Sequence, residues 1–284
     1  MPSIGSYIPL LSRCCGDVEH TRMETSELKR FLRDIIAEAG RISLAYRARL
    51  DGLVVHHKLE KDLVTEADVA VEQFLVDAIR KRYPDHAILG EEGGEQQGVA
   101  FRWVIDPIDG TTSFIHGHPF YSVSIAVEHD GRTILAAVNA PVLDELFEAQ
   151  MGSGATLNGK PVRVSRRSSL ADSVLATGFA CIRRGSAETN LPYFNRLLPA
   201  IRDVRRHGSA AVDLGYVACG RLEGFWELDL KIYDVAAGFL ILTEAGGRYS
   251  DFGGGTANLY DQILATNGLI HEQVMDIFGQ VAGR

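Results

Sequence analysis

The chain has 284 residues, of which 46% are hydrophobic and 23% are charged, a composition typical of a globular protein. Its formal net charge is −8. This disfavours a surface that binds nucleic acid or anionic membranes, although bound metal ions can still attract an anionic substrate locally. No apolar run is long enough to span a membrane. The four cysteines form no Cys-x-x-Cys pair, which argues against a zinc site, and their small number favours the reducing cytoplasm.

Residues 1–23 differ from the rest of the chain, and we expect them to form a flexible N-terminal extension. They combine Pro, Gly and Ser with a short apolar run at 7–11, and they lack the basic start and the cleavage site of a secretory signal. The first helix is expected to begin near Ser26, because apolar residues between positions 28 and 42 repeat at helical spacing. Residues 52–62 then predict a strand or loop.

The segment 62–68, Asp-Leu-Val-Thr-Glu-Ala-Asp, contains the signature of a helix start. Thr65 followed three residues later by Asp68 fits a capping box. The helix that it opens has an apolar face and ends at Tyr-Pro-Asp, residues 83–85. For Asp68 the first interpretation is therefore a cap partner, and a metal ligand is the alternative.

A short strand at 87–89 runs into the sequence Gly-Glu-Glu-Gly-Gly at 90–94. The neighbouring carboxylates of Glu91 and Glu92 repel each other unless a cation is present. A solvated acidic loop is the alternative interpretation.

The segment 103–112, Trp-Val-Ile-Asp-Pro-Ile-Asp-Gly-Thr-Thr, combines a buried strand with a polar turn. Pro107 and Gly110 are expected to force the turn. Asp106 and Asp109 lie on it with the carbonyl of Ile108 between them, and these are the hard oxygens that magnesium prefers. The N–H groups that follow suit a phosphate, so the segment indicates phosphoryl chemistry. The alternative is an ordinary Asp-rich turn before a helix cap.

The two carboxylate-bearing strand ends, at Glu91 and at Asp106, repeat one pattern. Two strands that end in carboxylates are what a metal site between adjacent strands would need.

The remainder of the chain divides into two patterns. Residues 120–164 predict a β-meander with hairpin turns at Asp130-Gly131 and Asn158-Gly159. After Ser165, strands and helices alternate, which is typical of α/β structure. The expected strands are 173–177, 203–207, 224–227 and 263–266, and the expected helices are 191–200, 210–219, 235–244 and one near His271.

Four blocks of this sequence together are similar to a known family. They are 62–68, 90–92, 103–112 and Tyr-Asp-Val-Ala-Ala-Gly at 233–238. In these blocks the chain resembles the inositol monophosphatase family of magnesium-dependent, lithium-sensitive phosphatases, from about residue 25 to the end. It departs from the family pattern at Tyr233, where Trp is common, and at Ser113, where Asn is common.

The resemblance implies a fold class of α/β (α+β) type, a layered αβαβα sandwich. We expect residues 24–164 to form an α+β domain with most metal ligands, and residues 165–284 to form an α/β domain that completes the active site and the substrate pocket. The resemblance also implies a homodimer.

The resemblance assigns roles to individual residues. Two or three Mg²⁺ ions would be held by Glu91, Asp106, Ile108 (through its carbonyl), Asp109, Asp234 and, more weakly, Asp68. The catalytic residues would be Glu91, Thr111 and Asp106, with Glu91 and Thr111 orienting the attacking water. The substrate would be bound by Asp109, Gly110, Thr111, Gly208, Ser209, Ala210, Glu227 and Asp234.

The expected function is magnesium-dependent hydrolysis of a small phosphorylated polyol, inositol 1-phosphate above all. Glu227, whose alternative interpretation is an exposed strand-end carboxylate, would accept hydrogen bonds from the polyol and repel a second phosphate. Other substrates remain open: fructose 1,6-bisphosphate, 3′-phosphoadenosine 5′-phosphate and histidinol phosphate. A metal-binding regulatory protein with vestigial activity is the alternative of another class. Glu91 and Thr111 argue against it, because binding alone needs no water-orienting pair.

Overall fold

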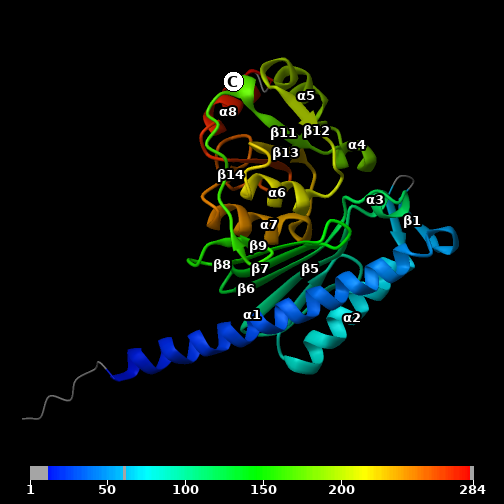
Figure 1. Cartoon of the computed structure of the whole chain (residues 1–284), viewed down its shortest axis with the longest axis vertical. Coiled ribbons are helices and arrows are strands. Elements are labelled where there is room, and N and C mark those ends of the chain that lie inside the picture. The colour runs from blue at the N-terminus through cyan, green and yellow to red at the C-terminus, as the bar shows by residue number, and fades with distance from the viewer. Residues whose placement is uncertain (1–11, 60–61, 282–284) are drawn as a thin grey trace, which may run out of the picture.

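A computed structural model describes residues 12–59 and 62–281 of the chain (Figure 1). Residues 1–11 of the expected N-terminal extension lie outside this range. Helix α1 (Ser12–Arg47) begins well before Ser26, so the predicted helix start was wrong. No proline interrupts residues 12–47, and the helical hydrogen bonds can therefore begin well before the first residue of the apolar repeat. Figure 1 shows the N-terminal part of α1 projecting beyond the large sheet.

The large sheet has eight strands and contains the predicted meander. In spatial order they are β10 (Lys160–Pro161), β9 (Ala155–Leu157), β8 (Glu145–Gln150), β7 (Arg132–Ala140), β6 (Ser122–His129), β5 (Phe101–Asp109), β3 (Ala87–Gly90) and β4 (Gly94–Gln96). Only β3 and β5 are parallel neighbours in this sheet. The predicted hairpin turns form with positive φ at Asp130-Gly131 and at Asn158-Gly159, as such two-residue turns require.

The second sheet has five strands and lies in the second half of the chain. In spatial order they are β12 (Asp203–Arg205), β11 (Val174–Thr177), β13 (Gly224–Leu228), β15 (Gln262–Thr266) and β14 (Arg248–Ser250). A separate two-stranded hairpin consists of β1 (Val55–Leu59) and β2 (Asp62–Thr65). Strands β4 and β14 were not predicted from the sequence.

Helices form three layers around the two sheets, which gives the predicted αβαβα sandwich (Figure 1). Helices α1 and α2 (Glu66–Arg82) pack on one face of the large sheet. Helices α6 (Ala210–Ala218) and α7 (Ile232–Glu244) lie between the sheets. Helices α5 (Leu191–Leu197) and α8 (His271–Val281) cover the outer face of the small sheet. The short helices are α3 (Thr111–Ile115), α4 (Ala180–Arg184), η1 (Leu50–Gly52), η2 (Leu170–Asp172) and η3 (Leu198–Ala200).

Strand β5 shows how the sequence sets these layers. Trp103 and Ile105 belong to the core beneath α1 and α2, whereas Val104 belongs to the core shared with α6 and α7. Alternate residues of a strand point to opposite faces of its sheet, so one apolar run can serve both cores. Nowhere in the described residues does a helix combine the length and apolarity needed to cross a bilayer.

Helix α7 is apolar on all sides because it lies between the two sheets. Every residue from Val235 to Leu242 is buried. Its Gly238 permits close contact with α6, since a Cβ there would lie 2.4 Å from Leu214 Cδ1. This tight packing fixes the start of α7, where Asp234 lies.

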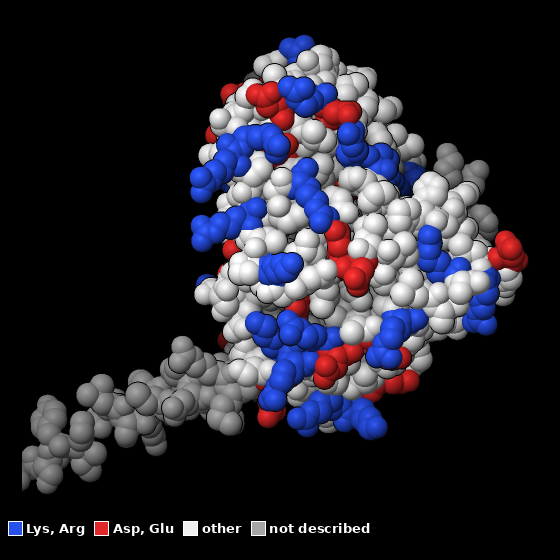
Figure 2. All heavy atoms as spheres, in the orientation of Figure 1, with Lys and Arg blue, Asp and Glu red and all other residues white. Residues whose placement is uncertain are grey.

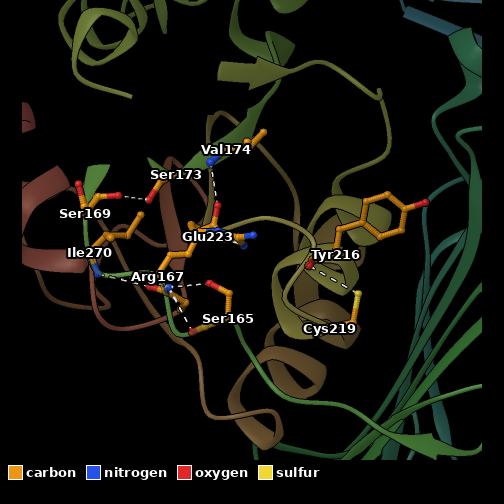
Figure 3. Close-up of polar contacts among 10 residues, drawn as sticks. Ser165, Arg167, Ser169, Ser173, Val174, Tyr216, Cys219, Glu223 and Ile270 are labelled. Atoms are coloured by element: carbon orange, nitrogen blue, oxygen red, sulfur yellow. Dashed lines mark hydrogen bonds and ion pairs between the residues drawn. The ribbon is translucent and has the colours of Figure 1, made fainter. Parts of the chain in front are cut away.

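The segment that joins the two sheets is held by a buried carboxylate (Figure 3). Glu223, only 1% exposed, accepts hydrogen bonds from the Val174 N–H at 2.7 Å and from Arg167 Nη1 at 2.8 Å. Ser173 Oγ donates to the Ser169 carbonyl at 2.7 Å. These bonds anchor the start of β11.

Candidate active site

The first two carboxylates of the site are placed by the pairing of β3 with β5. These strands are parallel neighbours, and Gly90 aligns with Ile105. The next residues, Glu91 and Asp106, therefore leave the same edge of the sheet side by side. Both line a cleft at this edge.

The polar turn differs from the prediction, because β5 continues through Pro107 as far as Asp109. Asp106 pairs with Ser124 and Asp109 with Ser122, so three steps along β5 match two steps along β6. The extra residue forms a β-bulge, a position where a strand tolerates proline. The bulge turns both aspartates toward the cleft.

Gly110, rather than Pro107, ends the strand. Its φ is +97°, a left-handed conformation that favours glycine. A Cβ at this position would lie 2.9 Å from the Gly208 carbonyl oxygen and 3.1 Å from that of Phe120. Gly110 thus brings the segment before α6 against the start of α3.

The centre of the site is a group of three carboxylates from distant parts of the chain. Asp106, Asp109 and Asp234 offer oxygen atoms that all lie within 4.8 Å of one another. Each carboxylate is positioned by hydrogen bonds from the chain. Asp106 Oδ1 accepts from the Ile108 N–H at 3.1 Å, and Asp234 Oδ2 accepts from the Lys231 N–H at 2.6 Å. Asp109 Oδ2 accepts from Ser209 Oγ at 2.6 Å and from the Ala211 N–H at 2.7 Å.

These carboxylates are too crowded to be ionised together without a cation. Burial raises the pKa of Asp109 and that of Asp234 to about 7. Burial, and then the charges of Glu91, Asp109 and Asp234, raise the pKa of Asp106 well above its ordinary value. A divalent cation would remove this penalty. The donors are all oxygens, which suits a hard ion such as Mg²⁺.

The Glu91 loop is positioned by a residue that the sequence analysis missed. Glu72 of α2 is 4% exposed, and its carboxylate accepts from the Glu92 N–H at 2.9 Å and from the Gly93 N–H at 2.5 Å. A Cβ at Gly90 would lie 2.6 Å from this carboxylate, so the glycine makes room for it. In the sequence, the signal for Glu72 was its position next to Val71, which places an acidic residue on the apolar side of α2.

Asp68 lies with Thr111, outside the group of three. Its Oδ2 accepts from the Thr65 N–H at 2.9 Å and from Thr65 Oγ1 at 2.5 Å, which completes the predicted capping box. Its Oδ1 accepts from Thr111 Oγ1 at 3.3 Å, and the same hydroxyl lies 3.2 Å from the Ile108 carbonyl oxygen. Burial raises the pKa of Asp68 to about 6. The structure therefore brings Asp68 to the Thr111 hydroxyl and leaves it off the cleft wall.

The predicted substrate residues line the same cleft, whose volume is about 220 Å³. Gly208, Ser209 and Ala210 form one wall, and Glu227 lies on another. Glu227 is only 5% exposed, so its interpretation as an exposed strand-end carboxylate was wrong. Its Oε1 accepts from the Ala180 N–H at 2.9 Å.

Several charged residues of the cleft wall were not predicted. They are Arg183, Arg184, Arg206, His207 and Asp213. The first two belong to α4, which lies where the sequence analysis had only a loop. The doublets Arg183-Arg184 and Arg205-Arg206 were the available signal, since the second directly precedes His207 and the predicted Gly208 segment.

A known protein family matches almost the whole of the chain. The sequence profile of the inositol monophosphatase family matches residues 24–281. The chain belongs to the inositol monophosphatase family. The match covers both sheets and every predicted site residue, so the family assignment made from four short blocks is confirmed.

Two relatives with high sequence identity to this chain carry the name Nus factor SuhB. The chain is 47% identical over 222 residues to Nus factor SuhB of Pseudomonas aeruginosa, covering 76% of this chain and 82% of that protein. It is also 47% identical over 207 residues to Nus factor SuhB of Escherichia coli, covering 72% and 78%.

Solved structures of the family agree with this fold. The extragenic suppressor protein suhB of Bartonella henselae superposes with a TM-score of 0.85 at 36% identity, covering 89% of this chain and 98% of that one. Inositol monophosphatase from Anabaena superposes with a TM-score of 0.81 at 36% identity, covering 90% and 97%.

Proposed function

We propose that this protein is a magnesium-dependent phosphatase that hydrolyses a small phosphate monoester, with inositol 1-phosphate as its preferred substrate. One observation carries the proposal: Asp106, Asp109 and Asp234 converge within 4.8 Å beside Gly110 and Thr111. Family membership supports the same chemistry.

Two or three Mg²⁺ ions would be held by the side chains of Glu91, Asp106, Asp109 and Asp234 and by the carbonyl of Ile108, with a weaker contribution from Asp68 beside Thr111. When bound, Mg²⁺ would activate a water nucleophile and stabilise the negative charge on the leaving oxygen. Every other contribution comes from the chain itself.

Thr111 and Glu91 would orient the attacking water. The Thr111 hydroxyl is held between the Asp68 carboxylate and the Ile108 carbonyl, which restricts its rotation. The N–H groups of Gly110 and Thr111 would bind phosphate oxygens. The water oxygen forms the new bond to phosphorus as the bond to the alcohol oxygen breaks, and no residue of the chain becomes phosphorylated.

The substrate preference rests on Glu227 and the size of the cleft. A cleft of about 220 Å³ is smaller than the roughly 300–1,000 Å³ of pockets for drug-sized ligands, which suits a small phosphate ester. A buried carboxylate at its wall can accept hydrogen bonds from neighbouring hydroxyls of a polyol.

Phosphate release from a substrate panel, with Mg²⁺ or with EDTA, tests the proposal. The panel contains inositol 1-phosphate, fructose 1,6-bisphosphate, adenosine 3′,5′-bisphosphate and histidinol phosphate. Glu227→Gln should lower kcat/KM for inositol 1-phosphate roughly 10-fold or more, because a hydrogen bond to a charged group contributes about 1.5–3 kcal/mol. An aryl phosphate without hydroxyls should be unaffected. Equal losses on both would remove the argument for a polyol, and no Mg²⁺-dependent release would contradict the whole proposal.

A second candidate function comes from the relatives named Nus factor SuhB, at 47% identity. Such a role would imply RNA polymerase as a partner, and it corresponds to a regulatory protein rather than an enzyme. Asp106→Asn separates the two functions, because Asp106 is 1% exposed and its replacement leaves the outer surface unchanged. If the variant loses hydrolysis but still co-purifies with RNA polymerase, both functions are present. If neither form co-purifies, the second candidate fails.

The quaternary state remains a proposal from the family resemblance, which implies a homodimer. Figure 2 shows basic and acidic side chains interspersed over one face of the molecule. Sedimentation of the purified chain tests the homodimer directly.

A further inference from the structure

A histidine–aspartate pair lies in the cleft wall and has no part in the chemistry described so far. Asp213 of α6 is 1% exposed, and its Oδ1 lies 2.5 Å from His207 Nδ1. Burial raises the pKa of Asp213, and the hydrogen bond from His207 opposes this rise. The contact with this carboxylate therefore fixes the orientation of the ring.

The surroundings of His207 leave one edge of its ring available. The ring centroid lies 4.4 Å from that of Phe120 and 5.5 Å from that of Tyr216. Nδ1 is occupied by Asp213, and the side chain is 13% exposed. Because His207 lines the cleft and its Nδ1 is taken by Asp213, Nε2 is the ring nitrogen left for a ligand.

His207 lies at the end of the cleft where the phosphate group is expected. Its carbonyl accepts a hydrogen bond from Ser113 Oγ of α3 at 3.2 Å. The next residue, Gly208, packs against Gly110. A Cβ added at Gly110 would lie 2.9 Å from the Gly208 carbonyl oxygen. A Cβ added at Gly208 would lie 2.9 Å from Arg206 Nη1. Arg206 and His207 therefore belong to the part of the cleft lining that adjoins Gly110.

We propose that His207, oriented by Asp213, is a binding residue for the phosphate group, and that its protonated ring donates a hydrogen bond from Nε2 to a phosphate oxygen. The inference rests on the proposed phosphatase function. A neutral ring that donates from Nδ1 to Asp213 presents a lone pair at Nε2, which repels an anion. Only the protonated ring donates at both nitrogens, so anion affinity should fall as the pH rises through the range where histidine loses its charge.

Charged groups of both signs lie around this part of the cleft. Asp213 contacts the ring at Nδ1, and the charge of Arg206 opposes the rise in the pKa of Asp213. Glu227 also lines the cleft, and its carboxyl group interacts electrostatically with Arg206 and Asp213. Tyr216 is neutral, because burial raises its pKa to about 12. Phe120, which packs against the ring, and Ser113, which donates to the His207 carbonyl, carry no charge.

The test measures binding of inorganic sulfate to the magnesium-loaded full chain by calorimetry at about pH 5.5 and about pH 8. Sulfate is suitable because its own charge does not change over this range, in which histidine titrates. The variants are His207→Gln, Asp213→Asn and a control, His118→Gln. His118 is an exposed histidine that lines the same cleft and forms no ion pair within the described residues.

Sulfate affinity of the unaltered protein should fall roughly 10-fold between the two pH values, the size expected for a charged hydrogen bond. His207→Gln should bind weakly at both, with a much smaller fall, Asp213→Asn should lie between, and His118→Gln should match the unaltered protein. KM for a phosphate ester should rise in His207→Gln while kcat changes little. A fall in His207→Gln as steep as in the unaltered protein would overturn the inference. Failure of the phosphatase proposal is recognised separately, by absence of phosphate release from the unaltered protein.

Discussion

Asp106 is the residue on which the proposed chemistry depends most directly. Asp106→Asn keeps the shape of the side chain but removes the charge that would hold metal ions. We expect activity to fall at least ~10²-fold, the scale of single losses in preorganised sites. The free energy of unfolding of the metal-free protein should increase near neutral pH, because a carboxylate at position 106 no longer experiences repulsion from Glu91, Asp109 and Asp234.

Phosphate-release assays and urea unfolding check both outcomes. Asp130→Asn is the matched control, since Asp130 is an exposed hairpin residue with a φ of +50°, which asparagine tolerates. Near-normal activity of Asp106→Asn at saturating Mg²⁺ would show that Asp106 is not a metal ligand.

Thr111 should affect turnover rather than metal binding. Thr111→Ala removes the hydroxyl that Asp68 and the Ile108 carbonyl hold in place. We expect kcat to fall roughly 10-fold or more from the misplaced water, with little change in the Mg²⁺ concentration needed for half-maximal activity. Thr112→Ala, at the exposed next position, is the control. A large loss of Mg²⁺ affinity with an unchanged saturated rate would assign Thr111 to the metal ions instead.

The residues of the site differ in how far the sequence could reveal them. Asp106 and Asp109 were found from their spacing on one turn, whereas Asp234 and Glu227 could be assigned only through the family resemblance, because no local pattern joins them to that turn. Glu72 and His207 were missed. Glu72 contacts the Glu91 loop and His207 contacts Asp213, and both contacts arise only when separate elements pack together.

At the scale of secondary-structure elements, the junction of β5 and α3 depends on Gly110. Gly110→Ala adds a Cβ at a φ of +97° and 2.9 Å from the Gly208 carbonyl oxygen. The left-handed conformation alone costs about 1–2 kcal/mol for a residue other than glycine. The clash must in addition move the Gly208 segment, so activity should fall as well as stability.

Gly131→Ala provides the comparison for this prediction. Gly131 also has a positive φ, +70°, but a Cβ there meets nothing within 4 Å. Urea unfolding should show a smaller loss of stability in Gly131→Ala, and phosphate release should be normal. Equal effects of the two substitutions would show that the contact between Gly110 and Gly208 is unimportant.

The elements that sequence patterns predicted best are those with clear periodicity or turn chemistry. The meander from β6 to β9 and helix α7 are examples. The errors have local physical causes. Pro107 lies within β5 because a bulge accommodates it, and the helix predicted at 191–200 divides into α5 and η3 where Pro199 lacks a donor. The strand β14 is only three residues long, too short to give a pattern.

At the scale of the whole molecule, the stabilisation by Mg²⁺ should increase with pH. In the folded metal-free protein Asp109 and Asp234 have pKa values of about 7, above the ordinary value of 3.8. The folded state then binds more protons than the unfolded state between these values, so these groups make stability fall as the pH rises from about 4 to about 7. Mg²⁺ binds the ionised carboxylates and reverses this loss.

Thermal unfolding with Mg²⁺ and with EDTA, from about pH 5 to about pH 8, checks the prediction. The difference in Tm between the two conditions is the quantity to compare. It cancels the opposite contribution of buried His271, whose pKa is lowered to about 4 and which makes stability rise with pH between about 4 and 6.5. A Tm difference that shrinks as the pH rises would contradict the metal-site assignment.

The distance along the chain between Asp109 and Asp234 also has a consequence for biosynthesis. Because 125 residues separate them, and a ribosome adds roughly 5–20 residues per second, the last carboxylate of the group emerges about 6–25 seconds after the first two. During that interval the large sheet of the nascent chain lacks helices α6 and α7, and its apolar face toward them is uncovered. The incomplete chain would therefore need protection from aggregation before it could bind its metal ions.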